Sequence, residues 1–318
     1  FEMLGSGANV ISTYSEGIRR YFSKIVPTVF SEEETNRILS VLLSNKEVSE
    51  RISLLGIREV NAKHTYQHRL NTILDKIGQA EKIGQEKGVS IIAYTDDEFG
   101  LKNILECYRK QRLFNKELII ITDNSLSFPQ FAEENVSIVQ DGKGDDWQET
   151  VLKRCKYPYI AVFHDRDYYA PYYLTDLLHA FNYTDADIVG KASYYEYNSE
   201  SKLLSLYNRG NENLYTKRVH KYAFLIKKER IGEVKSIFDI FYNKEEESLF
   251  ENAKIYSADR FSYVSLKSNK SFDSLGAEIV CCTQDFETHV NVEENIYINF
   301  EEDDDVIKEK TKAFNQRV

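Results

Sequence analysis

The sequence predicts an α/β fold in which a mixed, largely parallel sheet is flanked by helices and preceded by a small, mostly helical unit. Two runs, Val89–Tyr94 and Leu118–Thr122, are almost continuously apolar and flank a segment with helical periodicity. Such runs are typical of parallel strands that are buried on both faces and joined by a helical crossover. A third run, Ile160–Phe163, leads into a Leu-rich helical stripe. From Ala192 onward, shorter alternating segments predict antiparallel strands.

Composition excludes several classes of protein. The net charge is −10, with acidic residues concentrated in 293–305, which argues against nucleic acid as the main partner and against a polybasic membrane anchor. No apolar run approaches the roughly 20 residues that span a bilayer. The four cysteines lack zinc-ligand spacing, which favours a reducing, cytoplasmic location. Because the chain starts at Phe1 rather than Met, we expect a fragment of a longer protein.

Residues 1–77 are expected to form the first unit. Residues 1–12 predict a helix end, a glycine turn and a short buried strand. Ser31 and Glu34 have the spacing of a capping box at the start of a helix. A second helix is expected to close the unit with an apolar face formed by Leu70, Ile73, Leu74 and Ile77.

The remaining boundaries follow from composition. Residues 78–88 are polar and contain three glycines, which predicts a linker. Residues 89–302 then form the main domain, and residues 303–318 are a charged C-terminal tail. Residues 1–77 are expected to have a structural role in this chain. A helical unit this small has little core of its own, so it is expected to pack against the next domain.

Within the main domain, a helix after the first strand has Leu101, Ile104, Leu105 and Tyr108 on one face. A third strand is predicted at Val136–Val139 and a helix at Asp145–Cys155. The helix after the central strand is expected to begin at Pro171, which suits the first helical position. The second half is predicted to contain a helix at 237–250 and strands at 192–197, 203–206, 219–226, 261–266, 277–281, 289–292 and 296–300.

Carboxylates follow the strands that should lie side by side. Asp165 and Asp167 come directly after the central strand, and at spacing i, i+2 they are predicted to point the same way and share one divalent cation, Mn²⁺ or Mg²⁺. Such a cation could neutralise a diphosphate. Thr95, Asp96, Asp97 and Asp123 follow the first two strands. Ligands bind beyond the carboxyl ends of parallel strands, so these residues are expected around one crevice.

Residues 159–174 carry a strand, an Asp-x-Asp pair, aromatic residues, a proline and a Leu-rich helix. This arrangement resembles the nucleotide-sugar-dependent glycosyltransferases of the GT-A fold, family-2-like, from bacterial surface-polysaccharide clusters. The resemblance extends through residues 183–191 and 253–261 and covers about residues 88–290. It implies a Rossmann-like nucleotide-diphospho-sugar transferase domain.

The resemblance also implies an activity. A sugar would be transferred, with inversion, from a nucleotide-sugar, UDP-linked by preference, to a cell-surface polysaccharide, glycan or polyol-phosphate acceptor of the teichoic type. It implies association with other surface-polymer enzymes and a place at the inner face of the membrane. Thr95 and Asp123 match positions that hold the uridine. An ordinary turn at Asp123 explains that residue equally well.

The resemblance places the catalytic base in an acidic pair before a helix. Glu246 and Glu247 match that pair, with Glu247 where the family has Asp, and a base there would deprotonate the acceptor hydroxyl. A solvated, acidic helix start is the alternative interpretation of the same residues.

This chain departs from the family at His164 and Arg166, which replace two acidic residues. Two explanations compete. Arg166 and Lys191, with His164, could contact the diphosphate directly, since guanidinium binds phosphate bidentately. Alternatively, catalysis is lost and the domain binds nucleotide, glycan or partner enzymes. A nucleotidyltransferase ranks last, because the segment 95–100 lacks a Gly-rich basic loop.

The N-terminal segment has its own resemblance. Residues 1–7 have the pattern Phe-Glu-x-Leu-x-x-Gly, which is similar to the tail of a GT-B glycosyltransferase domain of the spore-maturation type. Glu2 would match the carboxylate that binds ribose in that family. The resemblance implies that residues 1–77 are the C-terminal remnant of such a domain.

Overall fold

The computed structural model describes residues 1–79, 83–84, 87–122, 133–140, 147–233, 238–242, 253–267 and 277–293. The chain divides into two compact units. The first contains residues 1–84 together with the segment from Val292, and the second contains residues 85–291.

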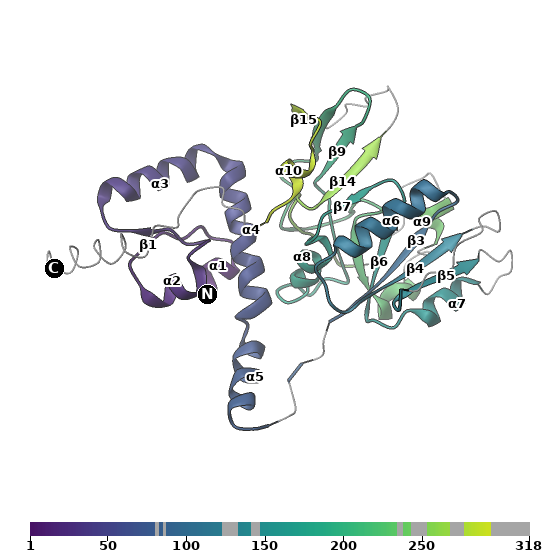
Figure 1. The fold of residues 1–318 in the computed structure, drawn as a ribbon, viewed down its shortest axis with the longest axis horizontal. Coiled ribbons are helices and arrows are strands. Elements are labelled where there is room, and N and C mark those ends of the chain that lie inside the picture. The colour runs from purple at the N-terminus through teal and green to yellow at the C-terminus, as the bar shows by residue number, and fades with distance from the viewer. Residues whose placement is uncertain are drawn as a thin grey trace. The chain divides into compact units, whose positions relative to one another are not determined.

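The first unit is mainly helical, with a two-stranded parallel sheet (Figure 1). Its buried side chains include Phe22, Val26, Ile38 and Leu55. The strands are short, and β1 is only partly buried, so the expected buried strand after residue 7 is shorter and more exposed than predicted. The elements are α1 (Glu2–Gly5), β1 (Ser12–Thr13), α2 (Glu16–Phe22), β2 (Thr28–Val29), α3 (Glu32–Ser44), α4 (Lys46–Lys63) and α5 (Tyr66–Lys76).

Side-chain caps begin the three longer helices of this unit. The Ser31 side chain accepts a hydrogen bond from the Glu34 N–H, which confirms the predicted cap of α3. The Glu34 carboxylate reaches back to the Phe30 N–H, one residue earlier than in a standard capping box. Asn45 and Thr65 cap α4 and α5 in the same way. Each cap satisfies a helix N–H that would otherwise lack a partner.

Helix α5 forms as predicted, but its apolar face is not a buried one. None of its residues is buried, and Leu70, Ile73 and Ile77 are all exposed. The periodicity of apolar residues therefore predicts the helix correctly and its packing incorrectly.

The second unit is built on an eight-stranded mixed sheet with strand order β11-β13-β8-β12-β6-β3-β4-β5. Strands β6, β3, β4 and β5 run parallel, as the sequence predicts. Strand β12 pairs antiparallel with both β6 and β8. The bounds are β3 (Val89–Tyr94), β4 (Lys116–Thr122), β5 (Val136–Gln140), β6 (Tyr159–His164), β8 (Ile188–Gly190), β11 (Leu214–Thr216), β12 (Phe224–Lys227) and β13 (Ile255–Ser257).

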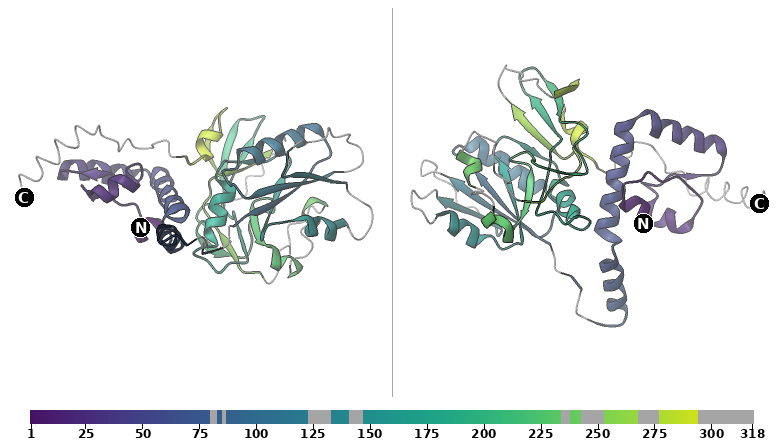
Figure 2. Two further views of the ribbon diagram at one scale, coloured as in Figure 1. Left: turned by 60° about the horizontal axis from the view of Figure 1, so that its bottom comes forward. Right: turned by 180° about the vertical axis from the view of Figure 1, so that it is seen from behind.

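Helices cover both faces of this sheet, as Figure 2 shows for α6 and α7. Side chains of α6 and α8 pack on one face with Ile91 and Ile120, and side chains of α7 and α9 pack on the other with Ile92 and Ile119. The alternation of neighbouring residues between the two cores explains why these strands are apolar throughout. The elements are α6 (Glu98–Lys110), α7 (Trp147–Arg154), α8 (Tyr173–Ala180), η1 (Lys228–Glu233) and α9 (Asp239–Tyr242).

A second sheet of five strands has the order β15-β10-β9-β14-β7, and β9, β14 and β15 lie together in Figure 1. Its first strand in the chain, β7, follows β6 after a turn of only three residues, so the two sheets are joined directly at that turn. The strands are β7 (Tyr168–Tyr169), β9 (Tyr194–Asn198), β10 (Leu203–Tyr207), β14 (Tyr263–Lys267) and β15 (Ala277–Cys282).

Several predicted elements differ in detail. The strand predicted at 219–226 is shorter, because residues 221 and 222 form a turn and β12 begins at Phe224. Helix α8 begins at Tyr173, two residues later than expected, because the chain first makes a turn at Pro171. The segment predicted as a strand at 289–292 instead begins with the short helix α10 (Glu287–Val290), in which Val290 is fully buried. The alternating pattern reflects two buried side chains, Val290 at the end of the helix and Val292 in the extended segment after it. The predicted strand at 296–300 and most of the helix at 237–250 lie outside the described residues.

We predict that Gly190→Ala lowers the free energy of unfolding by about 1–3 kcal/mol through overpacking. A Cβ at Gly190 would lie 2.6 Å from the Ala223 carbonyl oxygen and 2.8 Å from the Phe224 Cβ. Urea unfolding followed by circular dichroism measures the change. Gly17→Ala is the control, because a Cβ there meets no atom closer than 3.9 Å and a helical alanine is favoured. Equal stability of the Gly190 variant and the wild type would show that the end of β8 can move aside.

Candidate functional site

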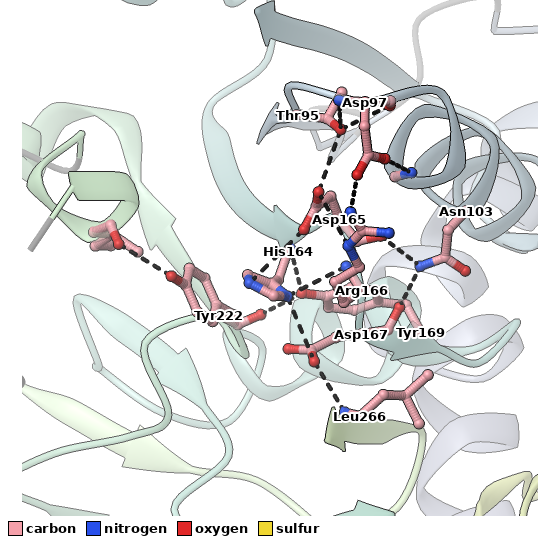
Figure 3. Close-up of polar contacts among 12 residues, drawn as sticks. Thr95, Asp97, Asn103, His164, Asp165, Arg166, Asp167, Tyr169, Tyr222 and Leu266 are labelled. Carbon is pink, nitrogen blue, oxygen red and sulfur yellow. Dashed lines mark hydrogen bonds and ion pairs between the residues drawn. The ribbon is translucent and has the colours of Figure 1, made fainter. Parts of the chain in front are cut away.

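The turns after β3 and β6 meet at the carboxyl ends of these two parallel strands. They bring together Thr95 and Asp97 from the first turn and His164, Asp165 and Arg166 from the second (Figure 3). Parallel pairing of β3 with β6, with Tyr94 opposite His164, places the two turns side by side. The structure thus brings Thr95, Asp97 and Asp165 together at this edge of the sheet.

Asp165 is held against the first turn of α6. The Thr95 hydroxyl donates to the Asp165 carboxylate at 3.3 Å, and Thr95 is itself fully buried. A Cβ on Gly100 would lie 2.4 Å from the Thr95 hydroxyl oxygen and 2.5 Å from the Asp165 carboxylate, so only glycine permits this approach. Burial raises the pKa of Asp165, although His164 and Arg166 oppose the shift. Thr95 thus positions a carboxylate and does not offer its hydroxyl to solvent.

Arg166 lies between two carboxylates and an aromatic ring. Its guanidinium pairs with Asp97, lies 3.6 Å from Asp165, and sits over the Phe99 ring at 5.0 Å from the centroid. Asp97 also caps α6 by accepting from the Gly100 N–H at 2.6 Å. That hydrogen bond, followed by Arg166, holds the pKa of Asp97 below its usual range. The Arg166 side chain remains 38% exposed and Phe99 68% exposed, so both can meet a ligand.

The Asp167 side chain is part of the core. Its carboxylate is buried, and its two oxygens accept hydrogen bonds from the Tyr263 hydroxyl at 2.6 Å and the Leu266 N–H at 3.1 Å. Burial alone would raise the pKa of Asp167, but His164 and the Tyr263 hydroxyl outweigh it, so the pKa is lowered. The carboxylate therefore ties the turn after β6 to β14 of the smaller sheet.

His164 ends β6 and links the buried and exposed parts of the site. Its ring lies on Tyr222 with centroids 4.4 Å apart, and Nδ1 is 3.6 Å from the Asp167 carboxylate. Its side chain is 32% exposed. His164 is thus a partly exposed imidazole in the same turn as Arg166, at the carboxyl end of β6.

Residues that sequence reasoning missed hold the turn in place. The Asn103 amide donates to the carbonyl oxygens of Asp165 at 3.0 Å and Asp167 at 2.9 Å. The Tyr169 hydroxyl accepts from the His164 N–H and donates to the Tyr222 carbonyl. The sequence gives one indication for Asn103, a polar residue that adjoins the apolar stripe of α6. For Tyr169, the run of aromatic residues after the Asp-x-Asp pair carried no indication of a partner.

Lys191 follows β8, whose direction matches that of β6 because both pair antiparallel with β12. The side chain is fully buried, and its ammonium lies 2.9 Å from the Asp259 carboxylate. Lys191 is therefore held in an internal ion pair, and its charge does not face the solvent as Arg166 does. Asp123, Glu246 and Glu247 lie outside the described residues.

The described residues do not fit a cation held jointly by Asp165 and Asp167. Both Asp167 oxygens are already hydrogen-bonded in the core, and the Arg166 guanidinium stands beside Asp165. Across the described part of the chain, no group of three or more His, Cys, Asp or Glu side chains is arranged to hold a metal ion. Of the two carboxylates, only that of Asp165 lies at the sheet edge, where it faces the first turn of α6.

The Arg166 guanidinium could bind an anion that displaces Asp97. A partly exposed guanidinium, a neighbouring imidazole and an exposed aromatic ring occur at one sheet edge. Guanidinium groups bind phosphate oxygens bidentately, and aromatic rings stack on planar groups.

None of the described helices is long and apolar enough to cross a membrane.

Comparison with known protein families gives a match within the first unit. Residues 1–75 match a family described as glycosyl transferase-like. No curated protein matches the chain.

Among solved structures, the chain is similar to S. aureus TarS. For TarS 1–349 in complex with UDP-GlcNAc, the TM-score is 0.41 at 13% identity, covering 58% of this chain and 60% of that chain. For TarS 1–349 in complex with UDP, the TM-score is 0.41 at 16% identity, covering 57% of this chain and 61% of that chain. The chain thus spans about three-fifths of the length of these structures.

We predict that His220 makes stability depend on pH. Burial lowers its pKa to about 3, while the Tyr263 hydroxyl lies 2.9 Å from its Nδ1. Below the unfolded pKa of about 6.5 the unfolded chain binds the additional proton, so stability falls as the pH decreases. Between pH 6.5 and 5 the loss from one such group is about 2 kcal/mol.

Urea unfolding at pH 7 and pH 5 tests this prediction in the wild type and in His220→Asn. Asparagine retains a polar atom near the position of Nδ1 but does not titrate. The variant should lose less stability on acidification than the wild type. An identical loss in both proteins would contradict a His220 that stays neutral in the folded protein.

Proposed function

We propose that the second unit is a GT-A-type glycosyltransferase domain that transfers a sugar from a UDP-sugar to a cell-surface polysaccharide or teichoic-type acceptor. The observation that carries the proposal is Arg166, a partly exposed guanidinium at the carboxyl ends of β3 and β6. The match of residues 1–75 to a glycosyl transferase-like family supports it. So does the resemblance of residues 159–174 to such enzymes.

The donor would bind with its diphosphate on Arg166. The guanidinium already lies between Asp97 and Asp165, so its direction is set before the ligand arrives. A doubly charged diphosphate can displace a surface carboxylate such as Asp97, because the exposed ion pair itself contributes little. Phe99, exposed and in contact with Arg166, would offer its ring to the uracil. His164 would donate a second hydrogen bond to the leaving phosphate.

The transfer itself would be a direct displacement. The acceptor hydroxyl oxygen forms a bond to the anomeric carbon while the bond from that carbon to the diphosphate oxygen breaks, which inverts the configuration. Its proton passes to a carboxylate base, for which we propose Glu247 or its neighbour Glu246. The charge that develops on the leaving UDP would be stabilised by Arg166 and His164. The proposed transfer uses no cation held between Asp165 and Asp167, since both Asp167 oxygens accept hydrogen bonds in the core.

Binding of UDP tests the role of Arg166. Arg166→Gln should weaken UDP binding by roughly 10- to 100-fold, which is the size expected for a lost charged hydrogen bond. Isothermal titration calorimetry with and without Mn²⁺ measures it. The control is Arg209→Gln, which removes an exposed arginine that pairs with Glu278 in the smaller sheet.

Three outcomes separate the interpretations. Metal-independent binding that is lost in Arg166→Gln supports the proposal. Binding that requires Mn²⁺ and is lost in Asp165→Asn would restore the cation site expected from the Asp-x-Asp spacing. The absence of UDP binding under all conditions would rule out a nucleotide-sugar donor.

A second candidate function is a domain that binds nucleotide or glycan, or assembles with partner enzymes, without catalysis. The observation that favours it is the internal use of Asp167, which leaves the Asp-x-Asp pair without its second open carboxylate. UDP binding without release of UDP from any UDP-sugar and acceptor fraction would support it. Under this interpretation, replacing both His164 and Arg166 by Asp should create Mn²⁺-dependent binding.

A further inference from the structure

A row of aromatic rings leads away from the candidate site within the second unit. It begins at His164, which lies on Tyr222 in Figure 3 with ring centroids 4.4 Å apart. The row continues from Tyr222 to His220 at 5.9 Å and from there to Tyr194 at 4.5 Å. Tyr194 stacks on Tyr207, with centroids 5.5 Å apart and 6° between the ring planes. Every ring of this row is partly exposed, and the proposed diphosphate site uses only the first of them.

The far end of the row carries a carboxylate. Glu196 and Tyr194 lie two residues apart in β9, so their side chains share one face of the smaller sheet. Tyr207 stands opposite Tyr194 on β10 and faces the same side. The Tyr207 hydroxyl donates to the Glu196 carboxylate at 3.4 Å, a long hydrogen bond that leaves the carboxylate able to accept others. Glu196 is partly exposed, and burial raises its pKa although Lys267 opposes the shift.

A hydroxyl beside Glu196 lacks a partner. Ser205 lies directly opposite Glu196 on β10, so it faces the same side of the smaller sheet. Its side chain is fully buried, and the hydroxyl oxygen has no hydrogen-bond partner among the described residues. A buried hydroxyl without a partner is costly. The polar groups at this end of the row are therefore not fully satisfied by the described part of the protein.

Stacked rings next to a carboxylate are complementary to a sugar. A pyranose has C–H faces that pack on aromatic rings, and hydroxyl groups at its edge that donate to carboxylates. A polyol phosphate has no ring face to pack, and its phosphates require cations. Lys221 lies over the Tyr222 ring at 5.3 Å, and the charge of Lys267 acts on Glu196. The aromatic rings form the longer part of the surface, which favours pyranose rings over a polyol phosphate.

We propose that this row binds a saccharide chain of two or more pyranose rings, with Glu196 accepting a hydrogen bond from a sugar hydroxyl and Tyr194 and Tyr207 packing on a ring face. Because the row begins at His164, a chain bound along it leads to the proposed nucleotide-sugar site. The role of this chain as the acceptor rests on the function proposed for the second unit and narrows that acceptor to a saccharide. Binding of the chain does not depend on that function.

Titrations followed by saturation-transfer-difference NMR test the proposal on the full chain. The probes are cellotetraose and chitotetraose, whose β-linked rings have flat C–H faces, and an oligomer of glycerol phosphate. The saccharides should bind, and Tyr207→Ala should weaken their binding roughly 5- to 10-fold through the loss of one packed ring. Tyr207→Phe keeps the ring and should weaken it less, whereas Glu196→Gln should weaken it through loss of the charged acceptor. The control is Tyr215→Ala, which removes an exposed tyrosine of the larger sheet outside the row.

UDP titrations on the same variants separate this inference from the proposed function. UDP binding should be unchanged in Tyr207→Ala, and saccharide binding should be unchanged in Arg166→Gln. Failure of both saccharides to bind would overturn the inference even where UDP binds. Equal binding to the wild type, Tyr207→Ala and Glu196→Gln, or tighter binding of the glycerol phosphate oligomer, would also overturn it. Saccharide binding without UDP binding would instead remove the proposed function and leave the saccharide site in place.

Discussion

The buried carboxylate of Asp167 is the interaction on which the second unit depends. The chain leaves the larger sheet at His164 and enters the smaller sheet at Tyr168, and Asp167 occupies the turn between them. A buried carboxylate is tolerated only when donors satisfy it, and here they come from Tyr263 and Leu266 in β14. The turn is thereby fixed, and His164 and Arg166 are presented in one orientation at the sheet edge.

Because of this constraint, the two carboxylates of the Asp-x-Asp pair have different surroundings. The expectation that both carboxylates face one cation assumed that strand alternation continues through them. Strand β6 ends at His164, so Asp165 and Arg166 lie in a turn where the two-residue period no longer applies. Asp165 consequently faces the start of α6, while Asp167 faces the core. The guanidinium of Arg166 occupies the space beside Asp165 that a shared cation would require.

Features governed by local periodicity could be predicted from the sequence, and those governed by distant partners could not. The parallel strands and the buried face of α6 followed from apolar patterns, and their parallel order placed Thr95 near Asp165. Nothing local showed that Tyr263, 96 residues away, donates to Asp167, nor that Asn103 holds the turn. The same limit explains α5, whose apolar stripe determines a helix but says nothing of a surface to cover it.

The ion pair of Lys191 and Asp259 has a consequence for how the sequence can change during evolution. Both members lie inside the unit, and the lysine is fully buried. Loss of either partner alone would strand an uncompensated charge in the core, whereas joint replacement by apolar residues of similar volume can be neutral. Divergent relatives of this chain should therefore keep both residues or have changed both. The two positions should change together during evolution.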